Sequence, residues 1–174
     1  MEEAKRSIVL IGFMGTGKSS IGRLLAAERG WARFDTDEMV ATALGLPISE
    51  IFAQLGEARF REEESTVLQS LAPEPPSIIV TGGGAVLRPA NVARMRALGT
   101  VVCLAADEAT LLRRLARRSN RPLLQNRNLT EAVPALLRER EPHYLEAADF
   151  TIETSSLTYE QVAQSIRDHL ALAG

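Results

Sequence analysis

The chain has 174 residues, of which 45% are hydrophobic, 24% charged and 5% aromatic, as in a single globular domain rather than a disordered or fibrous protein. Its formal net charge of −2 lacks the basic excess that recruits nucleic acid or anionic membranes, so we expect neither as a partner. The single cysteine, Cys103, excludes an intrachain disulfide and a thiolate metal cluster, and its apolar neighbours predict a buried strand. No apolar run approaches the ~18 residues of a membrane helix, and the first residues do not resemble a signal peptide, so a cytoplasmic protein is expected.

Short apolar runs alternate with longer segments of helical period along the chain, which predicts βα units around a parallel sheet covered on both faces. The five runs expected to form strands are Ser7–Ile11, Arg33–Phe34, Ile78–Thr81, Thr100–Leu104 and Phe150–Glu153. The segments expected to form helices are about 18–29, 57–71, 89–98, 108–118, 134–146 and 159–172. The polar, basic stretch 119–130 has no helical period and is expected to connect two elements. We find no internal repeat and no linker, and expect one domain, 1–174.

A phosphate-binding motif follows the first strand. The run GFMGTGKS at 12–19 matches G-x-x-x-x-G-K-[ST] between a strand and a helix, where its backbone N–H groups and the helix N-terminus surround phosphate. Lys18 would reach the outer phosphates, and the Ser19 hydroxyl would ligate Mg²⁺. The motif therefore predicts a nucleoside triphosphate site rather than the G-x-G-x-x-G site of dinucleotide enzymes. The residues expected to bind the nucleotide here are Gly12, Gly15, Thr16, Gly17, Lys18, Ser19 and Ser20.

The rest of the chain narrows the class of phosphate chemistry. No Asn-Lys pair occurs, so the guanine-binding N-K-x-D motif of common GTPases is missing, and the third strand ends in three glycines rather than an acidic residue. The second strand instead leads into Asp35 and Asp37, whose spacing of two would turn both carboxylates toward one site if both lay on the strand. One would then lie near the metal and the other near an acceptor hydroxyl. The alternative is that one of them caps a following helix whose first turn contains Glu38.

In their order along the chain, these motifs resemble the shikimate kinase family, and the likeness runs from about Ile8 to Asp149. The matching blocks are the phosphate loop, Phe34–Asp37, Gly56–Glu57 with Phe60, Arg61 and Glu64, Thr81–Gly84, Arg121–Leu124 and Arg140–Tyr144. The resemblance implies a three-layer α/β/α P-loop kinase of the nucleoside monophosphate kinase type with a five-stranded parallel sheet. It implies a substrate-binding segment at about 35–64 and a lid at about 113–126. The implied reaction uses ATP and Mg²⁺ to phosphorylate the 3-hydroxyl of shikimate, giving shikimate 3-phosphate and ADP, and the expected enzyme is a monomer.

The resemblance also implies a role for individual residues. Asp37 binds the acceptor hydroxyl and serves as base, and Asp35 lies near Mg²⁺, directly or through water. Arg121 of the lid reaches the transferring phosphate, and either Arg117 or Arg118 stacks on adenine. The residues implied in binding the acceptor are Asp37, Arg61, Gly82, Gly83, Gly84 and Arg140, with the two arginines on the substrate carboxylate, which a planar guanidinium meets with two parallel hydrogen bonds. The loop 154–157, where the family usually completes its adenine pocket, lacks the expected proline.

Each arginine has a simpler interpretation, and the function has rivals. Arg61 could form an i,i+4 pair with Glu57, Arg140 could pair with Glu141 or be solvated, and Arg121 could be a solvated loop residue. A kinase for another small hydroxy or sugar acid such as gluconate would use the same scaffold. A nucleoside monophosphate kinase would need room for a second base. A non-catalytic nucleotide-sensing or nucleic-acid-binding module is the alternative from another class.

Charge is segregated along the chain despite its near balance. The segment 35–64 has eight acidic residues and two arginines, whereas 113–140 has eight arginines and two glutamates. Arginine supplies 18 of the 20 basic residues, and the exceptions are Lys5 and Lys18. The basic segment suits a lid that closes over ATP and an acidic substrate.

Overall fold

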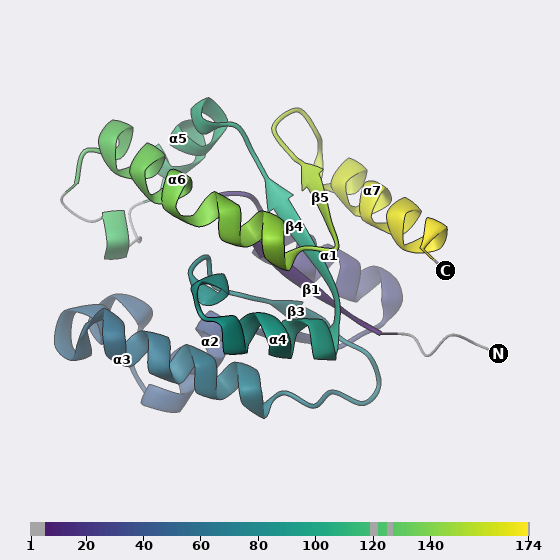
Figure 1. The fold of residues 1–174 in the computed structure, drawn as a ribbon, viewed down its shortest axis with the longest axis horizontal. Coiled ribbons are helices and arrows are strands. Elements are labelled where there is room, and N and C mark those ends of the chain that lie inside the picture. The colour runs from purple at the N-terminus through teal and green to yellow at the C-terminus, as the bar shows by residue number, and fades with distance from the viewer. Residues whose placement is uncertain (1–5, 119–121, 125–126, 174) are drawn as a thin grey trace.

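The computed structural model describes residues 6–118, 122–124 and 127–173 of the chain (Figure 1). Five parallel strands form one sheet in the order β2-β3-β1-β4-β5, which confirms the predicted α/β class. The strands are β1 (Ser7–Gly12), β2 (Arg33–Asp35), β3 (Ile78–Val80), β4 (Gly99–Ala105) and β5 (Phe150–Glu153). The α-helices are α1 (Lys18–Arg29), α2 (Thr36–Leu44), α3 (Ile48–Ser70), α4 (Pro89–Leu98), α5 (Glu108–Ala116), α6 (Leu129–Ala147) and α7 (Tyr159–Leu172). Two 3₁₀ turns, η1 (Ala85–Leu87) and η2 (Pro122–Leu124), complete the described elements.

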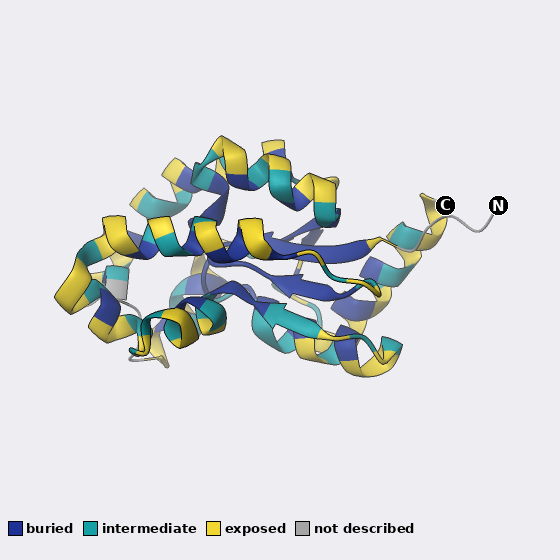
Figure 2. Cartoon of the chain, turned by 90° about the horizontal axis from the view of Figure 1, so that it is seen from below, coloured by how far each residue is buried: buried dark blue, intermediate teal, exposed yellow. Residues whose placement is uncertain are grey.

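Alternate residues of the central strand enter two separate cores. Val9 and Ile11 of β1 pack with side chains of α3, α4, α5 and α6, whereas Ile8 and Leu10 pack with α1 and α7 on the opposite face. Successive strand side chains point to opposite faces, so a strand covered on both sides must be apolar throughout. Figure 2 shows the result, with dark blue strands enclosed by helices whose outer faces are yellow. The predicted buried strand around Cys103 is confirmed, and burial raises the pKa of its thiol to about 11.

The predicted helices at 18–29, 89–98 and 159–172 are confirmed at both ends. The acidic segment 35–64 differs from the prediction. Helix α2 was not among the helices expected from the pattern and appeared only in the alternative that an aspartate caps a helix, and α3 begins at Ile48 rather than near 57. Gly56 interrupts α3 with a left-handed, non-helical backbone (φ 82°, ψ 166°), which no other residue type adopts readily. A third hydrophobic cluster between α2 and α3, centred on Val40, Ile51 and Phe60, supplies the packing that stabilises both helices.

Helix α6 begins earlier than predicted, at Leu129 instead of near 134. The side chain of Asn128 caps its N-terminus by accepting a hydrogen bond from the Thr130 backbone at 3.0 Å, and Pro134 lies inside the helix. The expected connection 119–130 is therefore shorter than predicted at its end, and it contains η2.

None of the described helices is by itself long and apolar enough to cross a membrane; α2 and α3 meet those criteria only as a pair bent by 87°.

The strand order opens a crevice at the carboxyl ends of β1 and β3. From β1 the chain crosses through α1 to β2 at one edge, whereas from β3 it crosses through α4 to β4 on the other side of β1. Where two neighbouring strands lead in opposite directions, the loops that follow them separate and leave a binding crevice. The phosphate loop follows β1 and the three-glycine turn follows β3, so the topology places both at this crevice.

Candidate active site

The phosphate loop is held in shape by its own lysine and threonine. Lys18 Nζ donates to the carbonyls of Gly12 (2.7 Å) and Phe13 (3.0 Å), and the Thr16 hydroxyl donates to the Phe13 carbonyl at 2.8 Å. Gly12 has φ 141°, and a Cβ there would lie 2.3 Å from the Leu104 carbonyl oxygen, so only glycine fits. The cavity that the loop surrounds is lined by Met14, Gly15, Gly17, Lys18, Ser19, Ser20, Asp35, Asp37, Val80, Thr81, Gly82, Gly83 and Arg118. Gly12 and Thr16, which were also predicted to bind the nucleotide, shape the loop but do not line this cavity.

Asp35 has two roles at the edge of the phosphate cavity. Its Oδ1 accepts hydrogen bonds from the backbone of Asp37 (3.0 Å) and Glu38 (3.3 Å), so it caps α2, as the alternative interpretation held. Its Oδ2 lies 3.5 Å from the Ser19 hydroxyl and 3.4 Å from Arg33 Nη1. The strand-alternation argument for the two aspartates is wrong, because β2 ends at Asp35 and Asp37 lies in α2. Both carboxylates nevertheless reach the same cavity.

The donor set of this cavity suits a metal that arrives with a nucleotide. Among the described residues, no group of three His, Cys, Asp or Glu side chains could hold a metal. Mg²⁺ at phosphate sites takes one or two protein oxygens and completes its shell with phosphate and water oxygens. The Ser19 hydroxyl and the Asp35 carboxylate, 3.5 Å apart beside the phosphate loop, are hard oxygen ligands of that kind. They fit Mg²⁺ bound together with a nucleotide rather than a resident metal.

A second cavity of about 170 Å³ adjoins the first and brings together all six residues predicted to bind the acceptor. Its lining is Met14, Asp37, Ile48, Phe52, Phe60, Arg61, Gly82, Gly83, Gly84, Leu123 and Arg140. The loop after β3, α2, α3 and α6 supply the polar part of this lining. Asp37, Gly82 and Gly83 line both cavities, so Asp37 stands where a phosphoryl donor and an acceptor would meet.

The three-glycine turn lets charged side chains approach the backbone. A Cβ on Gly82 would lie 2.5 Å from Glu64 Oε2 and 2.8 Å from Asp37 Oδ1, and one on Gly84 would lie 2.4 Å from Arg61 Nη2. Real Cβ atoms do not make contacts this short. A side chain at Gly82 or Gly84 would therefore displace the charged ends of Glu64, Asp37 or Arg61.

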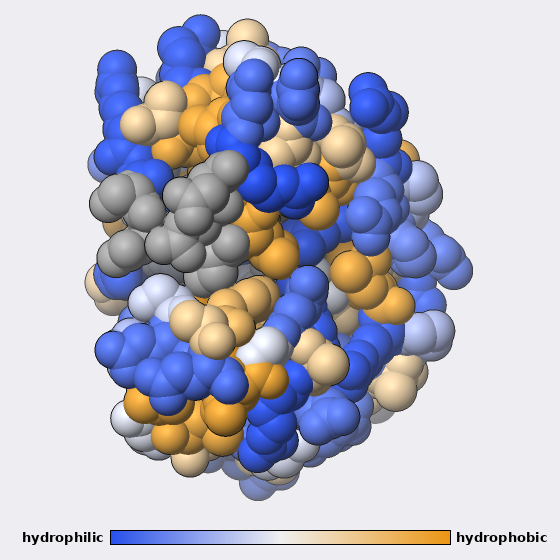
Figure 3. All heavy atoms as spheres, turned by 90° about the vertical axis from the view of Figure 1, so that its left-hand side faces the viewer, coloured by the Kyte–Doolittle hydropathy of each residue, from blue (hydrophilic) through white to orange (hydrophobic). Residues whose placement is uncertain are grey.

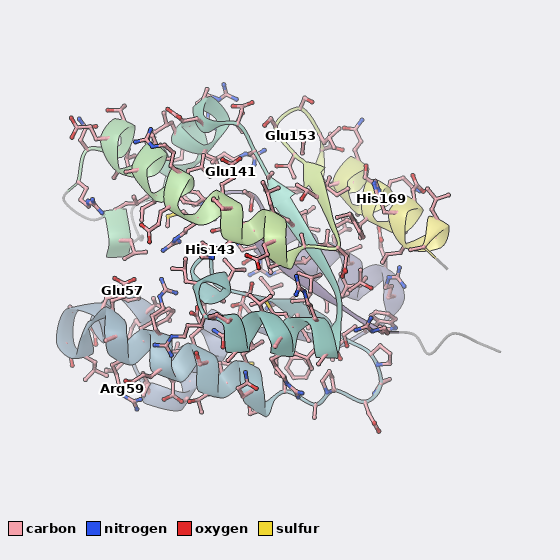
Figure 4. The ribbon with its side chains drawn as sticks, viewed as in Figure 1. Glu57, Arg59, Glu141, His143, Glu153 and His169 are labelled. Carbon is pink, nitrogen blue, oxygen red and sulfur yellow. The ribbon has the colours of Figure 1, made fainter. Side chains whose placement is uncertain are left out.

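Arg61 forms ion pairs within α3 and also lines the acceptor cavity. Its guanidinium lies 3.0 Å from Glu64 Oε1 and 3.4 Å from Glu57 Oε1, so the i,i+4 pair exists alongside a place in the acceptor cavity. Figure 4 shows Glu57 and Arg59 on opposite sides of α3, with Glu57 on the side nearer α6. Arg140 is only 2% exposed, which excludes a solvated surface role.

Glu64 is a site residue to which the sequence reasoning assigned no role, although the matching motif contained it. It is 1% exposed and pairs with Arg61. Burial raises the pKa of its carboxyl above the usual value, and nearby Asp37 raises the pKa further, while Arg61 and Arg140 oppose both effects. The carboxylate pairs with Arg61 and offsets part of the positive charge of the two arginines.

We expect Glu64→Gln to remove a pH dependence of stability. Because the folded-state pKa of Glu64 is raised, the folded protein binds the proton more tightly than the unfolded chain, and its contribution to stability declines as pH rises above about 4.5 toward the raised pKa. Urea unfolding at several pH values between 4.5 and 7.5 checks this. The stability of the wild type relative to the variant should decrease across the range; a difference independent of pH would contradict the raised pKa.

A third cavity, of about 350 Å³, continues from the phosphate loop on the other side. Its lining is Gly15, Gly17, Thr110, Arg113, Arg114, Arg117, Arg118, Ser155 and Tyr159. Arg117 and Arg118 both line this cavity, and their contact with the nucleotide base stays a prediction, while Arg121 lies outside the described residues. Figure 3 views the side of the molecule that is leftmost in Figure 1, where blue hydrophilic and orange apolar side chains intermix around the grey residues.

Arg114 was missed by the sequence reasoning and connects three parts of this third cavity. Its guanidinium donates to the Gly15 carbonyl at 3.1 Å, to the Thr154 hydroxyl at 3.3 Å and to the Thr154 carbonyl at 3.4 Å. The side chain thus ties α5 to the phosphate loop and to the loop after β5. The only signal in the sequence was the density of arginines between 113 and 118.

Tyr159 supplies an aromatic ring in the region where the sequence lacked the expected proline. It is 49% exposed, and its Cε1 lies 3.4 Å from the Cβ position of Gly17. Because stacking on an aromatic side chain is worth roughly 1–3 kcal/mol per base, we expect Tyr159→Ala to weaken ATP binding by about 5- to 100-fold. Calorimetry with ATP and with tripolyphosphate, which has no base, measures this. Equal losses for both ligands would instead mean that Tyr159 supports the phosphate loop.

Comparison with known proteins agrees with this geometry. The family model described as shikimate kinase matches residues 14–171. Curated shikimate kinases of Thermodesulfovibrio yellowstonii and Moorella thermoacetica are 47% and 46% identical, over 92% and 94% of each chain. The chain belongs to the shikimate kinase family. A solved family structure, shikimate kinase from Acinetobacter baumannii in complex with shikimate, superposes with a TM-score of 0.92 at 36% identity, covering 98% of this chain and 96% of that one.

The same fold is shared by a more distant kinase. A gluconokinase from Sinorhizobium meliloti superposes with a TM-score of 0.53 at 17% identity, covering 99% of this chain and 95% of that one. This likeness concerns the fold alone. The identity of the acceptor therefore depends on the side chains of the second cavity and on membership of the shikimate kinase family.

Proposed function

We propose that the protein transfers the γ-phosphoryl group of ATP to the 3-hydroxyl of shikimate, giving shikimate 3-phosphate and ADP. The observation that supports this most directly is the junction of the two cavities at Asp37, with Arg61 and Arg140 in the acceptor cavity. The A. baumannii relative, whose structure holds shikimate, matches the chain over nearly its whole length. A small acid with one carboxylate and a ring of hydroxyls fits two arginines and an aspartate on one cavity.

In this proposal Asp37 is the general base and Lys18 stabilises the transferring phosphoryl group. The Asp37 carboxylate accepts the proton of the acceptor hydroxyl while that oxygen forms a bond to the γ-phosphorus, and the bond to the oxygen bridging the β- and γ-phosphates breaks. Lys18, and Arg121 of the lid, stabilise the charge that spreads over the transferring group. Ser19 and Asp35 would hold Mg²⁺, which would neutralise charge on the nucleotide phosphates. Arg61 and Arg140 hold the carboxylate so that the reacting hydroxyl faces Asp37.

The proposal includes the organisation expected from the sequence. The chain acts as one catalytic domain, 1–174, with a substrate-binding segment at about 35–64 and a lid at about 113–126. We propose that it works as a cytoplasmic monomer whose partners are ATP and shikimate, and that it binds neither nucleic acid nor a membrane.

A coupled ADP-release assay tests the proposal. Purified protein is given ATP and Mg²⁺ with shikimate, gluconate, AMP or no acceptor, and formation of shikimate 3-phosphate is followed by mass spectrometry. We expect shikimate alone to raise ADP release well above the rate without acceptor. The proposal fails if shikimate gives no stimulation, or if gluconate or AMP is the better acceptor.

A further inference from the structure

Tyr144 lies behind the acceptor cavity and forms part of neither cavity that meets at Asp37. It belongs to α6, is 4% exposed, and its hydroxyl donates to the Gly83 carbonyl at 2.6 Å, across 61 residues of chain. Arg140 lies one turn earlier on α6; burial raises the pKa of the Tyr144 phenol, and the Arg140 guanidinium lowers this pKa by a smaller amount. The Tyr144 hydroxyl therefore joins the part of α6 that carries Arg140 to the Gly83 backbone.

Arg140 and Gly83 both line the acceptor cavity. Gly83 lines the phosphate cavity and the acceptor cavity, and its Cβ position lies 3.2 Å from Arg140 Nη1 and 3.6 Å from the Met14 backbone nitrogen. The Cβ position of Gly83 thus lies close to both Arg140 and the phosphate loop. Any change in the spacing of these two groups alters the distance from the carboxylate-binding arginine to the transferring phosphate.

Arg140 is buried, so its position depends on the groups that pack against it. It is 2% exposed, and its Nε has no hydrogen-bond partner. One of the groups packed against this guanidinium is Gly83, whose Cβ position lies 3.2 Å from Arg140 Nη1 and whose carbonyl is held by the Tyr144 hydroxyl.

We propose that Tyr144 is a positioning residue for the acceptor site, whose hydroxyl sets Arg140 and the Gly83 backbone at the spacing that aligns the substrate carboxylate with the phosphate loop. The inference rests on the proposed function, because it needs an anionic acceptor on Arg140. The aromatic ring has a separate role: it packs in the core with Cys103, Leu111 and Val133. Phenylalanine keeps that packing and removes only the hydroxyl.

The test compares Tyr144→Phe with the wild type and with a control that loses an equally buried hydroxyl. Ser77 is 2% exposed, and its hydroxyl donates to the Pro75 carbonyl at 3.2 Å just before β3, at the end of the sheet away from the cavities. Ser77→Ala should reduce thermal stability without changing the kinetic constants of the folded enzyme. Each variant is assayed for shikimate KM, ATP KM, kcat and melting temperature.

We expect Tyr144→Phe to raise the shikimate KM by roughly 10-fold, because the Gly83 backbone beside Arg140 loses the hydrogen bond that fixes it, while the ATP KM changes less than about twofold. An unchanged shikimate KM with a lower melting temperature, as in Ser77→Ala, would overturn the assignment, and so would an equal rise in both KM values. A wild type inactive on shikimate would overturn this inference together with the proposed function. An active wild type with an unaltered variant KM overturns the Tyr144 inference alone.

Discussion

Asp37→Asn should lower the kcat for shikimate phosphorylation by about two to four orders of magnitude and leave ATP affinity nearly unchanged. General base catalysis typically contributes ~10²- to 10⁴-fold, and the amide that replaces the carboxylate cannot accept the hydroxyl proton. Nucleotide affinity is expected to persist because the phosphate loop, Lys18 and Ser19 are unaltered. Asparagine has nearly the same shape as aspartate, so α2 and the cavity junction should be preserved.

Glu38→Gln is the matched control for this variant. Glu38 lies in the same first turn of α2, but it is exposed and pairs with Arg33 at 3.0 Å rather than lining either cavity. Steady-state kinetics with shikimate, together with calorimetry for ATP, should separate the two variants. Retention of more than a tenth of wild-type kcat in Asp37→Asn would show that Asp37 is not the base, and an equal loss in Glu38→Gln would point to a general effect on α2.

Arg61→Lys should raise the shikimate KM by about 10- to 100-fold with a smaller effect on kcat. A guanidinium binds a carboxylate with two parallel hydrogen bonds, whereas an ammonium offers a point charge, and a hydrogen bond to a charged group is worth roughly 1.5–3 kcal/mol. Arg61 pairs with Glu64 and lines the acceptor cavity at the same time, and we expect that a lysine would not reach both. The loss of binding should therefore exceed the loss of one contact with substrate.

Arg59→Lys is the control on the same helix. Arg59 lies on the other side of α3 from Glu57, where it pairs with Glu63 at 3.3 Å (Figure 4). Initial rates at varied shikimate and saturating ATP should show a raised KM in Arg61→Lys and wild-type values in Arg59→Lys. A wild-type KM in Arg61→Lys would remove Arg61 from carboxylate binding and leave it as the ion-pair partner of Glu57 and Glu64.

The layered fold and the phosphate loop could be predicted because their signals are local. Apolar runs such as Ile8–Ile11 identify strands buried on both faces, and the glycine and lysine spacing of residues 12–19 has one structural context. The acceptor residues Arg61 and Arg140 followed only from the order of several motifs, since each alone reads as a charged helix residue. Their convergence on one cavity depends on how α3 and α6 pack against the sheet.

The missed features depend on contacts between distant parts of the chain. Helix α2 and the early start of α3 are stabilised by packing of the two helices against each other, and α3 continues past Gly56, a residue that by propensity argues against a helix. Arg114 meets the Gly15 carbonyl across 99 residues and Tyr144 meets Gly83 across 61. Tyr144 and Gly83 each belong to a matching motif, but no motif or periodicity shows that either pair is in contact. Side chains that position a site from behind are therefore the ones that sequence patterns show least.

The shared boundary of the two cavities has a consequence for cellular ATP. Asp37, Gly82 and Gly83 face the donor and the acceptor alike, so without acceptor the same space beside the phosphate loop is filled by solvent. A water molecule there has a proton to give to Asp37 and an oxygen to offer to phosphorus, which would turn the kinase into a futile ATPase. An acceptor that fills the second cavity before transfer would exclude that water. How much ATP is lost to water thus depends on the residues that the two cavities share.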